Sequence, residues 1–548
     1  MKILLVNPAF PPSLWDFEHC RDLDGSRYAH PPLSLPTLAA LTPPGHAVRL
    51  LDENVGLVDL DADAALVGLT GYWMQRERVF ELADAFRARG RTVALGGPLV
   101  EESTLEECAR HADVVFLGEA ELTWPRFLRE LEAGTAGAVY RQEEFVDLAD
   151  SPLPRFELLD RRAYSTATIE TSRGCPMTCE FCEIPTRLGR RPRTKSIPQV
   201  LAEVRALHAL GADSIFFVDD NFVGDRRRAK ALLEELARFA RSIGYAIDFS
   251  CQITIDAAKD EALLELLYAA NIRRVFVGLE SPRPASLKEA GKRQNLATEV
   301  QENIRRLQER NIAVWAGMIV GFDHDDAGIF DEHLRFLAEA GVPVVMSGLL
   351  QAIPGTPLYR RMEAAGRLRE VEMAGVRGRL AAAVTTNIVP RGLTDEELRS
   401  GYLKMLRALY DEEAYGDRLL TALRRSRRPT QPKRGAKVAT TAGTTAGAKL
   451  GPERRAILGR ILKHYLLTRD ARRRRLFLRV VLETLRHAPA QLESALFHLV
   501  VYKHLRHFHE RLSAQLPREE PGRSPSARDL RDLRDLREPF GGTDDRAR

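Results

Sequence analysis

The sequence predicts an α/β fold in three parts: a helix-covered parallel sheet, a partial (βα)6 barrel of the TIM type and a helical C-terminal extension. Short β-branched or leucine-rich runs alternate with helical stretches as far as residue 350, which is typical of parallel sheets. A loop with three closely spaced cysteines follows the first strand-like run of the second part. Beyond Gly366 helical periodicity replaces the strand pattern. With 548 residues, the chain is too long for one ordinary core.

The composition is that of a globular chain, with 44% hydrophobic and 29% charged residues. The 81 basic and 76 acidic side chains give a net charge of only +5, so nothing in the charge calls for nucleic acid. Six cysteines in so long a chain do not make a disulfide framework and indicate a reducing compartment. The first apolar run stops at Asn7-Pro8, and no stretch is long enough to cross a bilayer. We therefore expect a cytoplasmic protein.

The first part, residues 1–140, contains five strand-like runs separated by helical stretches. Three of these runs end in turn residues, namely Thr70-Gly71, Gly96-Gly97-Pro98 and Gly118-Glu119. Because open α/β sheets bind ligands at the carboxyl ends of their strands, a cofactor crevice is expected here. Ordinary strand-to-helix turns are the alternative. The five runs are Lys2–Val6, Ala47–Leu51, Ala65–Leu69, Thr92–Leu95 and Val114–Leu117.

The second part, residues 166–366, follows a proline-rich linker at residues 141–165. It repeats a strand-then-helix unit six times, which predicts a partial barrel whose chemistry lies at the carboxyl ends of the strands. Its six strand-like runs are Ala167–Thr171, Ser214–Val218, Asp248–Ile253, Arg274–Leu279, Val314–Val320 and Val344–Leu350.

Three cysteines, Cys175, Cys179 and Cys182, follow the first barrel strand with CxxxCxxC spacing. A closed structural zinc site needs four ligands, yet no histidine lies between His111 and His208. A 4Fe-4S cluster held by three thiolates keeps one iron open for a substrate or cofactor. A disulfide pair or an incomplete zinc knuckle is the alternative.

This triplet, with the aromatic Phe181 just before its last cysteine, resembles the signature of the radical S-adenosylmethionine (SAM) enzymes. The resemblance implies that the open iron chelates the amino and carboxylate groups of SAM. It also implies that an electron from the cluster, supplied by a donor such as flavodoxin or ferredoxin, cleaves SAM to a 5′-deoxyadenosyl radical.

Residues that follow the second and fourth barrel strands are candidates for SAM binding. The paired carboxylates Asp219 and Asp220 match in position the segment that holds the SAM amino group in this family, although they also suit a helix cap. Glu280 and Ser281 offer a carboxylate and a hydroxyl to the ribose.

The four further candidates for SAM binding are two basic residues and two glycines. Lys292 or Arg293 could pair with the SAM carboxylate, with a pair of solvated surface cations as the alternative. Gly317 and Gly321 lie on a strand that resembles the adenine-contacting strand of the family, where glycine permits close approach of the backbone.

A domain of this pattern just ahead of a radical SAM core resembles the Rossmann-like cobalamin-binding half of cobalamin-dependent members, as do the segments 31–35 and 95–98. The DxHxxG motif is missing, so no histidine from that motif is expected on cobalt. In the loop at 70–75, Tyr72 or Trp73 would cover cobalt without coordinating it, unless these rings simply pack beneath the sheet. The corrin contacts implied are Thr70, Tyr72, Trp73, Gly96, Gly97 and Gly118.

The C-terminal part begins with a helical extension at 367–423, in which Thr394 and Glu397 predict a capped helix start. Residues 424–452 predict a disordered linker, residues 453–516 a helical region broken at Pro489, and residues 517–548 a disordered tail. The basic amphipathic helices either cap the barrel and form the wall of the substrate pocket, which we favour, or rest on an anionic membrane surface at the inner face of the membrane.

Taken together, the chain resembles cobalamin-dependent radical SAM enzymes, in the subgroup with hopanoid methylases. The implied function is methyl transfer from SAM, through methylcobalamin, to an unactivated carbon of a small-molecule or lipid substrate. One alternative is a radical cyclisation or rearrangement that uses cobalamin without methyl transfer. Another is a non-catalytic cobalamin or redox sensor.

Overall fold

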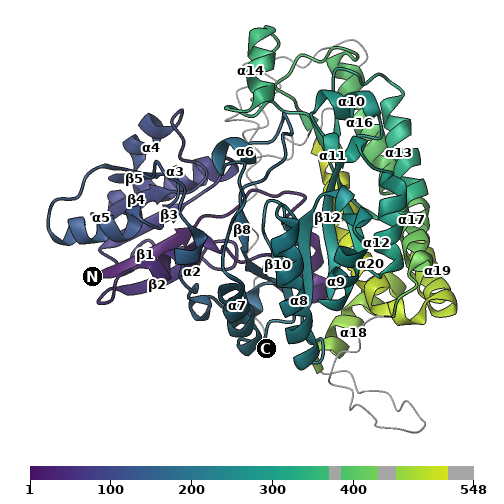
Figure 1. The fold of residues 1–548 in the computed structure, drawn as a ribbon, viewed down its shortest axis with the longest axis horizontal. Helices are drawn as coiled ribbons and strands as arrows, with labels where there is room; N and C mark the ends of the chain where they lie inside the picture. Colours follow the sequence, from purple (N-terminus) through teal and green to yellow (C-terminus); the bar gives the residue numbers. More distant parts are fainter. Residues whose placement is uncertain (370–383, 430–451, 516–548) are drawn as a thin grey trace.

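The computed structural model describes residues 1–369, 384–429 and 452–515 and contains two six-stranded parallel sheets. Figure 1 shows the first sheet on the left, the second sheet in the middle and the C-terminal helices on the right. This is the α/β architecture that the sequence predicts. The predicted tail at 517–548 and residues 430–451 of the predicted linker lie outside the described residues.

The first sheet has the strand order β2-β1-β3-β4-β5-β6, with every pair parallel. The chain order reverses between β1 and β3, which is where open α/β sheets form their ligand crevice. Helices α3 and α4 contribute to one apolar core on this sheet, and α2 and α5 to the other. The elements are β1 (Lys2–Asn7), α2 (Ser34–Leu41), β2 (Ala47–Asp52), β3 (Leu66–Thr70), α3 (Arg76–Arg87), β4 (Thr92–Gly96), α4 (Leu105–His111), β5 (Val114–Leu117), α5 (Thr123–Glu132) and β6 (Val139–Arg141).

The second sheet runs β7-β10-β11-β12-β13-β14 in chain order, again all parallel, and β7 and β14 are its two edges. The sheet is therefore an open barrel, as the six predicted βα units require. Its elements are β7 (Ala167–Ile169), α7 (Ile197–Ala209), β10 (Ser214–Phe217), α8 (Arg226–Ser242), β11 (Asp248–Ile253), α9 (Glu261–Ala269), β12 (Ile272–Glu280), α10 (Pro284–Glu289), α11 (Arg293–Leu296), α12 (Val300–Glu309), β13 (Ala313–Val320), α13 (Ile329–Ala340), β14 (Val344–Leu349) and α14 (Pro357–Ala364).

The C-terminal helices pack beside the β14 edge of the barrel. They are α16 (Asp395–Leu409), α17 (Glu412–Arg425), α18 (Pro452–Leu466), α19 (Ala471–His487) and α20 (Leu492–Gln515). Thr394 and Glu397 form the predicted capping box of α16. The hydroxyl of Tyr402 donates to the Ser347 carbonyl over 2.6 Å, and that of Tyr410 donates to the Val345 carbonyl. These bonds satisfy backbone groups that an edge strand would otherwise leave unpaired.

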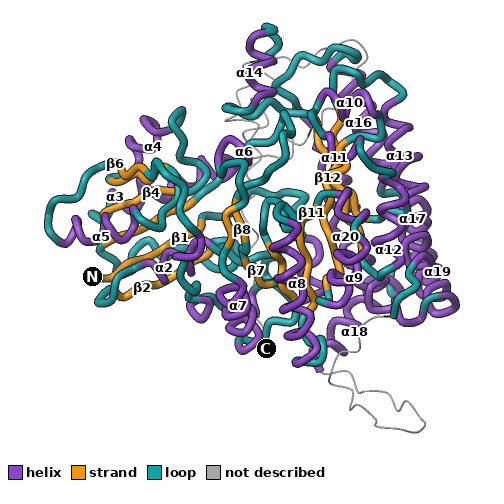
Figure 2. The backbone as a smooth tube through the Cα atoms, in the orientation of Figure 1, coloured by secondary structure: helices purple, strands orange, loops and turns teal. Residues whose placement is uncertain are grey.

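A loop from the first domain enters the barrel beside α20. Trp15 lies 5.3 Å from the ring of Phe276, and Phe17 lies 5.9 Å from that of Trp315. The 3-10 turn Glu18–Cys20 packs on α20, where the Cys20 thiol donates to the Val500 carbonyl over 3.3 Å. Segments almost 500 residues apart thus meet beside the barrel strands. Figure 2 shows the two groups of strands, with α20 on the side of the second group that lies away from the first.

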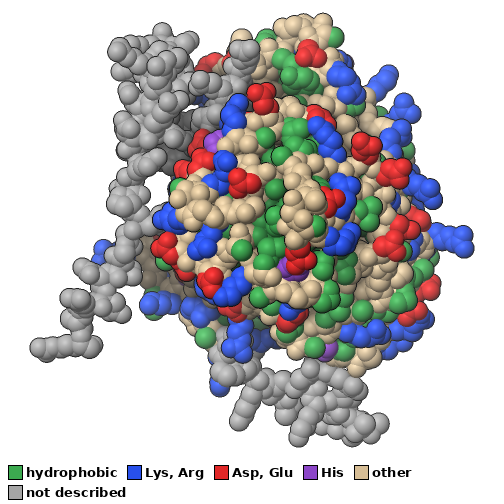
Figure 3. Space-filling model, turned by 90° about the vertical axis from the view of Figure 1, so that its left-hand side faces the viewer, with side chains coloured by type: hydrophobic (Ala, Val, Ile, Leu, Met, Phe, Trp, Pro, Cys, Tyr) green, Lys and Arg blue, Asp and Glu red, His purple; other side chains and the backbone are tan. Residues whose placement is uncertain are grey.

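The linker at 141–165 is a series of short 3-10 turns that folds back on the first domain. The Tyr164 hydroxyl donates to the Asp52 carboxylate over 2.8 Å. Among the described helices, none combines the length and apolar character needed to cross a bilayer. Figure 3 shows the face formed by the first domain, where basic and acidic side chains are interspersed with hydrophobic ones.

Candidate active site

The three-cysteine loop lies between the two strands of a short antiparallel hairpin, β8 (Ser172–Arg173) and β9 (Arg193–Thr194), and contains α6 (Ile184–Arg187). Gly174 has a φ of +91°, and a Cβ there would lie 2.9 Å from the Gly189 carbonyl. Only glycine fits this turn without strain. The hairpin therefore fixes the backbone at the start of the cysteine loop.

Polar side chains from the loop after β10 and from α11 approach the thiols. The Asn221 amide lies 4.0 Å from the Cys175 sulfur, and the Gln294 amide lies 3.6 Å from the Cys179 sulfur. Hydrogen bonds to ligating sulfurs are one of the features that set the potential of an iron–sulfur cluster. Burial raises the pKa of the Cys182 thiol to about 12, so ligation by iron must displace a proton.

The donor set fits a cubane cluster better than a single metal ion. All six cysteines are free thiols. Across residues 1–369, 384–429 and 452–515, no group of three or more His, Cys, Asp or Glu side chains is arranged around a point that one metal ion would occupy. In a 4Fe-4S cluster each thiolate binds a different iron, so its three sulfurs need not converge on one point.

The two aspartates after β10 separate in space. Asp219 is fully buried and accepts hydrogen bonds from the Thr171 amide over 2.6 Å and the Ser172 hydroxyl over 2.8 Å. These contacts tie the base of the cysteine hairpin to β10. Asp220 accepts from the Gly174 amide over 2.9 Å and keeps its second oxygen for another donor. Burial raises the pKa of Asp220 to about 6.

Glu280 and Lys292 form a buried ion pair of 2.6 Å beside the thiols. Burial alone would lower the pKa of Lys292, but Glu280 and the thiols of Cys179 and Cys182 raise it overall. Glu280 has a φ of +66°, a conformation that is uncommon outside glycine and often found at functional sites. A Cβ at Gly278 would lie only 2.8 Å from the Lys292 amine, so this glycine makes room for the pair.

The other candidates for SAM binding differ from one another in burial and in position. Ser281 is buried, and its hydroxyl accepts from the Arg283 amide over 3.2 Å. Arg293 is exposed, whereas the neighbouring Lys292 points inward. Gly317 lines the barrel cavity described below, and Gly321, with a φ of +108°, forms the turn after β13.

A cavity of about 420 Å³ lies inside the barrel. Its wall combines strands β12, β13 and β14 with the first-domain loop, α16 and α20. Sequence reasoning missed most of these contributors, among them Trp15, Met74 and His509, because only tertiary packing brings them there. The lining residues are Pro11, Pro12, Ser13, Leu14, Trp15, Met74, Phe276, Gly278, Glu280, Gly317, Met318, Ile319, Met346, Ser347, Gly348, Tyr402, Leu406, Phe508, His509 and Leu512.

The loop after β3 presents its side chains in different directions. Tyr72 is 53% exposed and lies within electrostatic reach of Asp220 and of the cysteine loop. Trp73 packs against the first-domain core instead, with the Arg76 guanidinium 5.2 Å from its ring. Gln75, which sequence reasoning did not single out, donates to the Pro8 carbonyl over 2.5 Å and so ties this loop to the end of β1.

The glycines at the other strand ends serve tight turns. Gly97 has a φ of +89°, and a Cβ there would collide with the Thr70 hydroxyl. Gly118 has a φ of +91°, and a Cβ there would lie 2.8 Å from the Gln142 carbonyl. A Cβ at Gly96 would lie 3.4 Å from Phe116. The turns therefore need glycine at Gly97 and Gly118 whether or not a ligand binds beside them.

Known proteins resemble this chain in sequence over most of its length. Residues 169–337 match the radical SAM superfamily, and residues 356–517 match a domain of unknown function, DUF4070. An uncharacterized methyltransferase of Synechocystis sp. is 34% identical over 76% of this chain and 78% of its own. Hopanoid C-2 methylase of Rhodopseudomonas palustris is 32% identical over 67% of this chain and 71% of its own.

The chain belongs to the radical SAM superfamily, in the family of these methyltransferases. The cobalamin-dependent SAM radical enzyme OxsB shares the fold, with a TM-score of 0.58 and 16% identity over 94% of this chain and 80% of its own. The radical SAM methyltransferase TsrM from Kitasatospora setae has a TM-score of 0.51 and 18% identity, covering 68% of this chain and 77% of its own. The predicted family is confirmed, and with it the use of a 4Fe-4S cluster and SAM.

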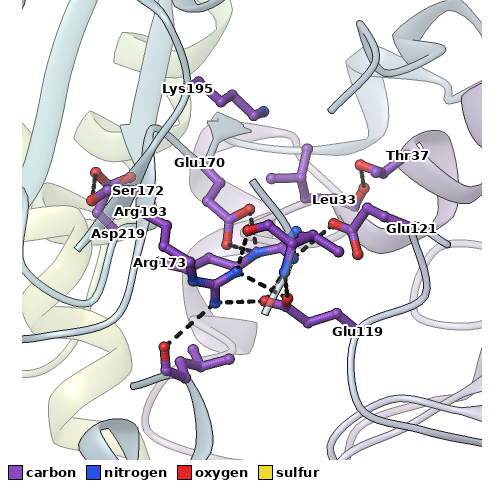
Figure 4. A network of polar contacts seen from close by, with 12 residues as sticks. Leu33, Thr37, Glu119, Glu121, Glu170, Ser172, Arg173, Arg193, Lys195 and Asp219 are labelled. Atoms are coloured by element: carbon purple, nitrogen blue, oxygen red, sulfur yellow. Dashed lines mark hydrogen bonds and ion pairs between the residues drawn. The ribbon is translucent and has the colours of Figure 1, made fainter. Parts of the chain in front are cut away.

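In this radical SAM enzyme, a half-buried charge network joins the first domain to the cysteine hairpin (Figure 4). Glu119, just after β5, lies 3.1 Å from Arg173 and 2.7 Å from Arg193. Arg173 also pairs with Glu121 and Glu170, over 2.7 and 2.9 Å. Although burial raises the pKa of Glu119, the two arginines lower it overall, which keeps the carboxylate charged. The network fixes the carboxyl end of the first sheet against the cluster loop.

Proposed function

We propose that this radical SAM enzyme is a cobalamin-dependent methyltransferase that acts on an unactivated carbon of a largely apolar small molecule or lipid. The names of the sequence relatives support methyl transfer, and OxsB and TsrM have been solved with cobalamin bound. The proposal rests on the observation that the expected cobalamin site and the cysteine loop face each other. The strand ends of the first sheet, where cobalamin would lie, are tied to the hairpin that holds the three cysteines.

The residues of the first domain suit a corrin. Tyr72 and Met74 expose apolar surface at the side of the sheet that faces the barrel, and Phe10 supports Tyr72 with a ring separation of 5.8 Å. We assign the position beneath the lower corrin face to Tyr72 rather than Trp73, because Trp73 packs on the core. Thr70, Gly96, Gly97 and Gly118 would shape the backbone around the ring.

The barrel residues suit SAM. When bound, the cluster, SAM and cobalamin together supply reductive cleavage of SAM and delivery of a methyl group. Asp220, beside Gly174, would accept a hydrogen bond from the SAM amino group, and Lys292, paired with Glu280, would bind the SAM carboxylate. Gly278 and Gly317 line the barrel cavity, where the nucleoside would lie. A reductant such as flavodoxin or ferredoxin would supply the electron.

The same architecture keeps water away from reactive species. The first-domain loop around Trp15 and Phe17 and the helix α20 close the side of the barrel that its sheet leaves open. Closure of this kind strengthens electrostatic interactions in the site and protects reactive intermediates from side reactions.

The function is tested by following SAM with a labelled methyl group. Protein reconstituted without oxygen with iron, sulfide and cobalamin is given a reductant and a panel of polycyclic and linear lipids. We expect one product to gain one methyl group, with S-adenosylhomocysteine and 5′-deoxyadenosine released in equal amounts. Deoxyadenosine without S-adenosylhomocysteine would indicate cyclisation or rearrangement instead. No deoxyadenosine with any reductant would indicate a sensor.

A surface on α19 is the second feature that bears on the substrate. Leu478, Leu482 and Leu485 are 46%, 63% and 48% exposed and lie on one face of the helix. Exposed arginines lie at both ends of this leucine face, at Arg475 and Arg486. Figure 1 places α19 at the outer edge of the molecule, away from the first sheet. We propose that this leucine face rests on an anionic membrane surface, from which a lipid substrate could enter.

Vesicle binding tests the leucine face. We expect the protein to sediment with phosphatidylglycerol vesicles and not with phosphatidylcholine vesicles, and Leu482→Glu to reduce the bound fraction at least fivefold. Leu57→Glu is the matched control, because Leu57 is 95% exposed on the first domain and its replacement should change nothing. Equal binding by Leu482→Glu and wild type would overturn the proposal, as would loss of self-association rather than of vesicle binding.

A further inference from the structure

Helix α20 places a histidine in the wall of the barrel cavity. Phe508, His509 and Leu512 line the cavity from this helix, and His509 is only 7% exposed. Its ring stacks on Tyr410 with a centroid separation of 4.5 Å and an interplanar angle of 18°. The stacking fixes the plane of the imidazole, and both ring nitrogens are buried.

Neither ring nitrogen of His509 has a hydrogen-bond partner among the described residues, and neither does the hydroxyl of Ser347 in the same wall. The nearest tyrosine hydroxyls are already engaged, because Tyr402 and Tyr410 donate to carbonyls of β14. Buried polar groups are normally paired, and leaving one unpaired is costly. Two unpaired polar groups in the wall of one cavity therefore indicate a ligand.

A buried histidine without a hydrogen-bond partner does not by itself indicate a ligand. His333, on α13, is also fully buried with both ring nitrogens unpaired, but it does not line the cavity. What distinguishes His509 is its position in an open space large enough for an organic molecule. His333 thus provides a matched control for the effect of a buried histidine as such.

The remaining lining defines the chemistry of the ligand. Most of the wall is apolar, with the side chains of Trp15, Met74, Phe276 and Met346 among its members. Among the described residues that line the cavity there is no lysine or arginine, so this part of the wall offers no cation to a carboxylate or phosphate. The acidic residue among them, Glu280, is engaged with Lys292 on the cofactor side.

We propose that His509 and Ser347 bind a neutral polar group, a hydroxyl, on an otherwise apolar substrate and thereby orient it in the barrel. This rests on the proposed function only in taking the cavity as the substrate site. Burial lowers the pKa of His509 to about 3, so the ring is neutral and offers one donor and one acceptor. A serine hydroxyl can likewise donate and accept, and an alcohol is complementary to both.

The test compares binding of 5α-androstan-3β-ol with that of 5α-androstane, which lacks the hydroxyl. The part of the tryptophan fluorescence that is lost in Trp15→Phe comes from this cavity residue and reports occupancy without turnover, so failure of methyl transfer does not affect the result. We expect wild-type protein to bind the alcohol at least tenfold more tightly than the hydrocarbon. His509→Leu should reduce this preference to twofold or less without weakening hydrocarbon binding, and Ser347→Ala should reduce it partly.

Two controls make the outcome decisive. His333→Leu should keep the full preference for the alcohol. His509→Leu should fold at least as stably as wild type, because it removes an unpaired buried polar group, and it should bind SAM as well as wild type does. An unchanged preference in His509→Leu would overturn the proposal. So would weaker SAM binding by that variant, equal binding of the two probes, or binding of neither.

Discussion

Replacing Cys179 with alanine is expected to abolish both the brown iron–sulfur absorbance and the cleavage of SAM. Three thiolates are the only cysteine ligands in the loop, so removal of one leaves two, which is too few to hold a cubane that keeps an open iron. Deoxyadenosine formation should fall below detection, which is at least a thousandfold loss. Cobalamin binding should persist, because the first domain has its own sheet and its own cores.

The matched control is Cys251→Ala. Cys251 is fully buried in β11 but lies outside the cysteine loop, so its replacement tests the effect of losing a buried thiol. This variant should keep its iron and cleave SAM at a normal rate. Retention of a stoichiometric cluster and of deoxyadenosine formation in Cys179→Ala would contradict the assignment of the three cysteines.

Replacing Lys292 with methionine is expected to destabilise the protein and to prevent SAM binding. The change leaves Glu280 buried without its partner at 2.6 Å. Breaking a buried ion pair on one side costs about 3–5 kcal/mol, because the remaining charge is uncompensated. Urea unfolding of the barrel should report this loss, and deoxyadenosine formation should fall at least a hundredfold.

A double variant separates stability from SAM binding. Glu280→Gln combined with Lys292→Met removes both charges, so most of the lost stability should return. SAM cleavage should not return, because no cation remains for the SAM carboxylate. Arg293→Met is the control, since Arg293 is exposed, and it should leave both stability and SAM cleavage intact. If the double variant recovered cleavage, Lys292 would have no role beyond neutralising Glu280.

The strands could be predicted from sequence because parallel strands buried on both faces read as continuous apolar runs. All eleven predicted runs correspond to strands, with ends shifted by two residues at most. The strand β6 and the hairpin β8–β9 were not predicted, since segments of two or three residues carry no periodicity. The three cysteines of the site could be predicted from their spacing alone, because all three come from one short loop.

The rest of the site depends on the direction in which each side chain points and on packing between segments that are distant in the sequence. Neighbouring residues such as Asp219 and Asp220 look alike in sequence, yet Asp219 bonds to Thr171 and Ser172 while Asp220 faces the cysteine loop. Residues of α16 and α20 line the cavity, which agrees with the prediction that C-terminal helices form part of a pocket wall, and its use by a substrate stays a proposal. The sequence could not show that His509 is one of the α20 residues in the cavity wall. This depends on the rotation of α20 about its axis and on its position along the barrel, which only tertiary packing sets.

The central claim is that three thiolates leave one iron of the cluster open to SAM. The most direct measurement is pulsed electron paramagnetic resonance on reduced, anaerobically reconstituted protein with SAM that carries ¹⁵N in its amino group. We expect hyperfine coupling between the cluster and the label, because the amino nitrogen binds the iron that no cysteine holds. Absence of coupling with SAM bound, or a metal centre fully ligated by protein side chains, would contradict it.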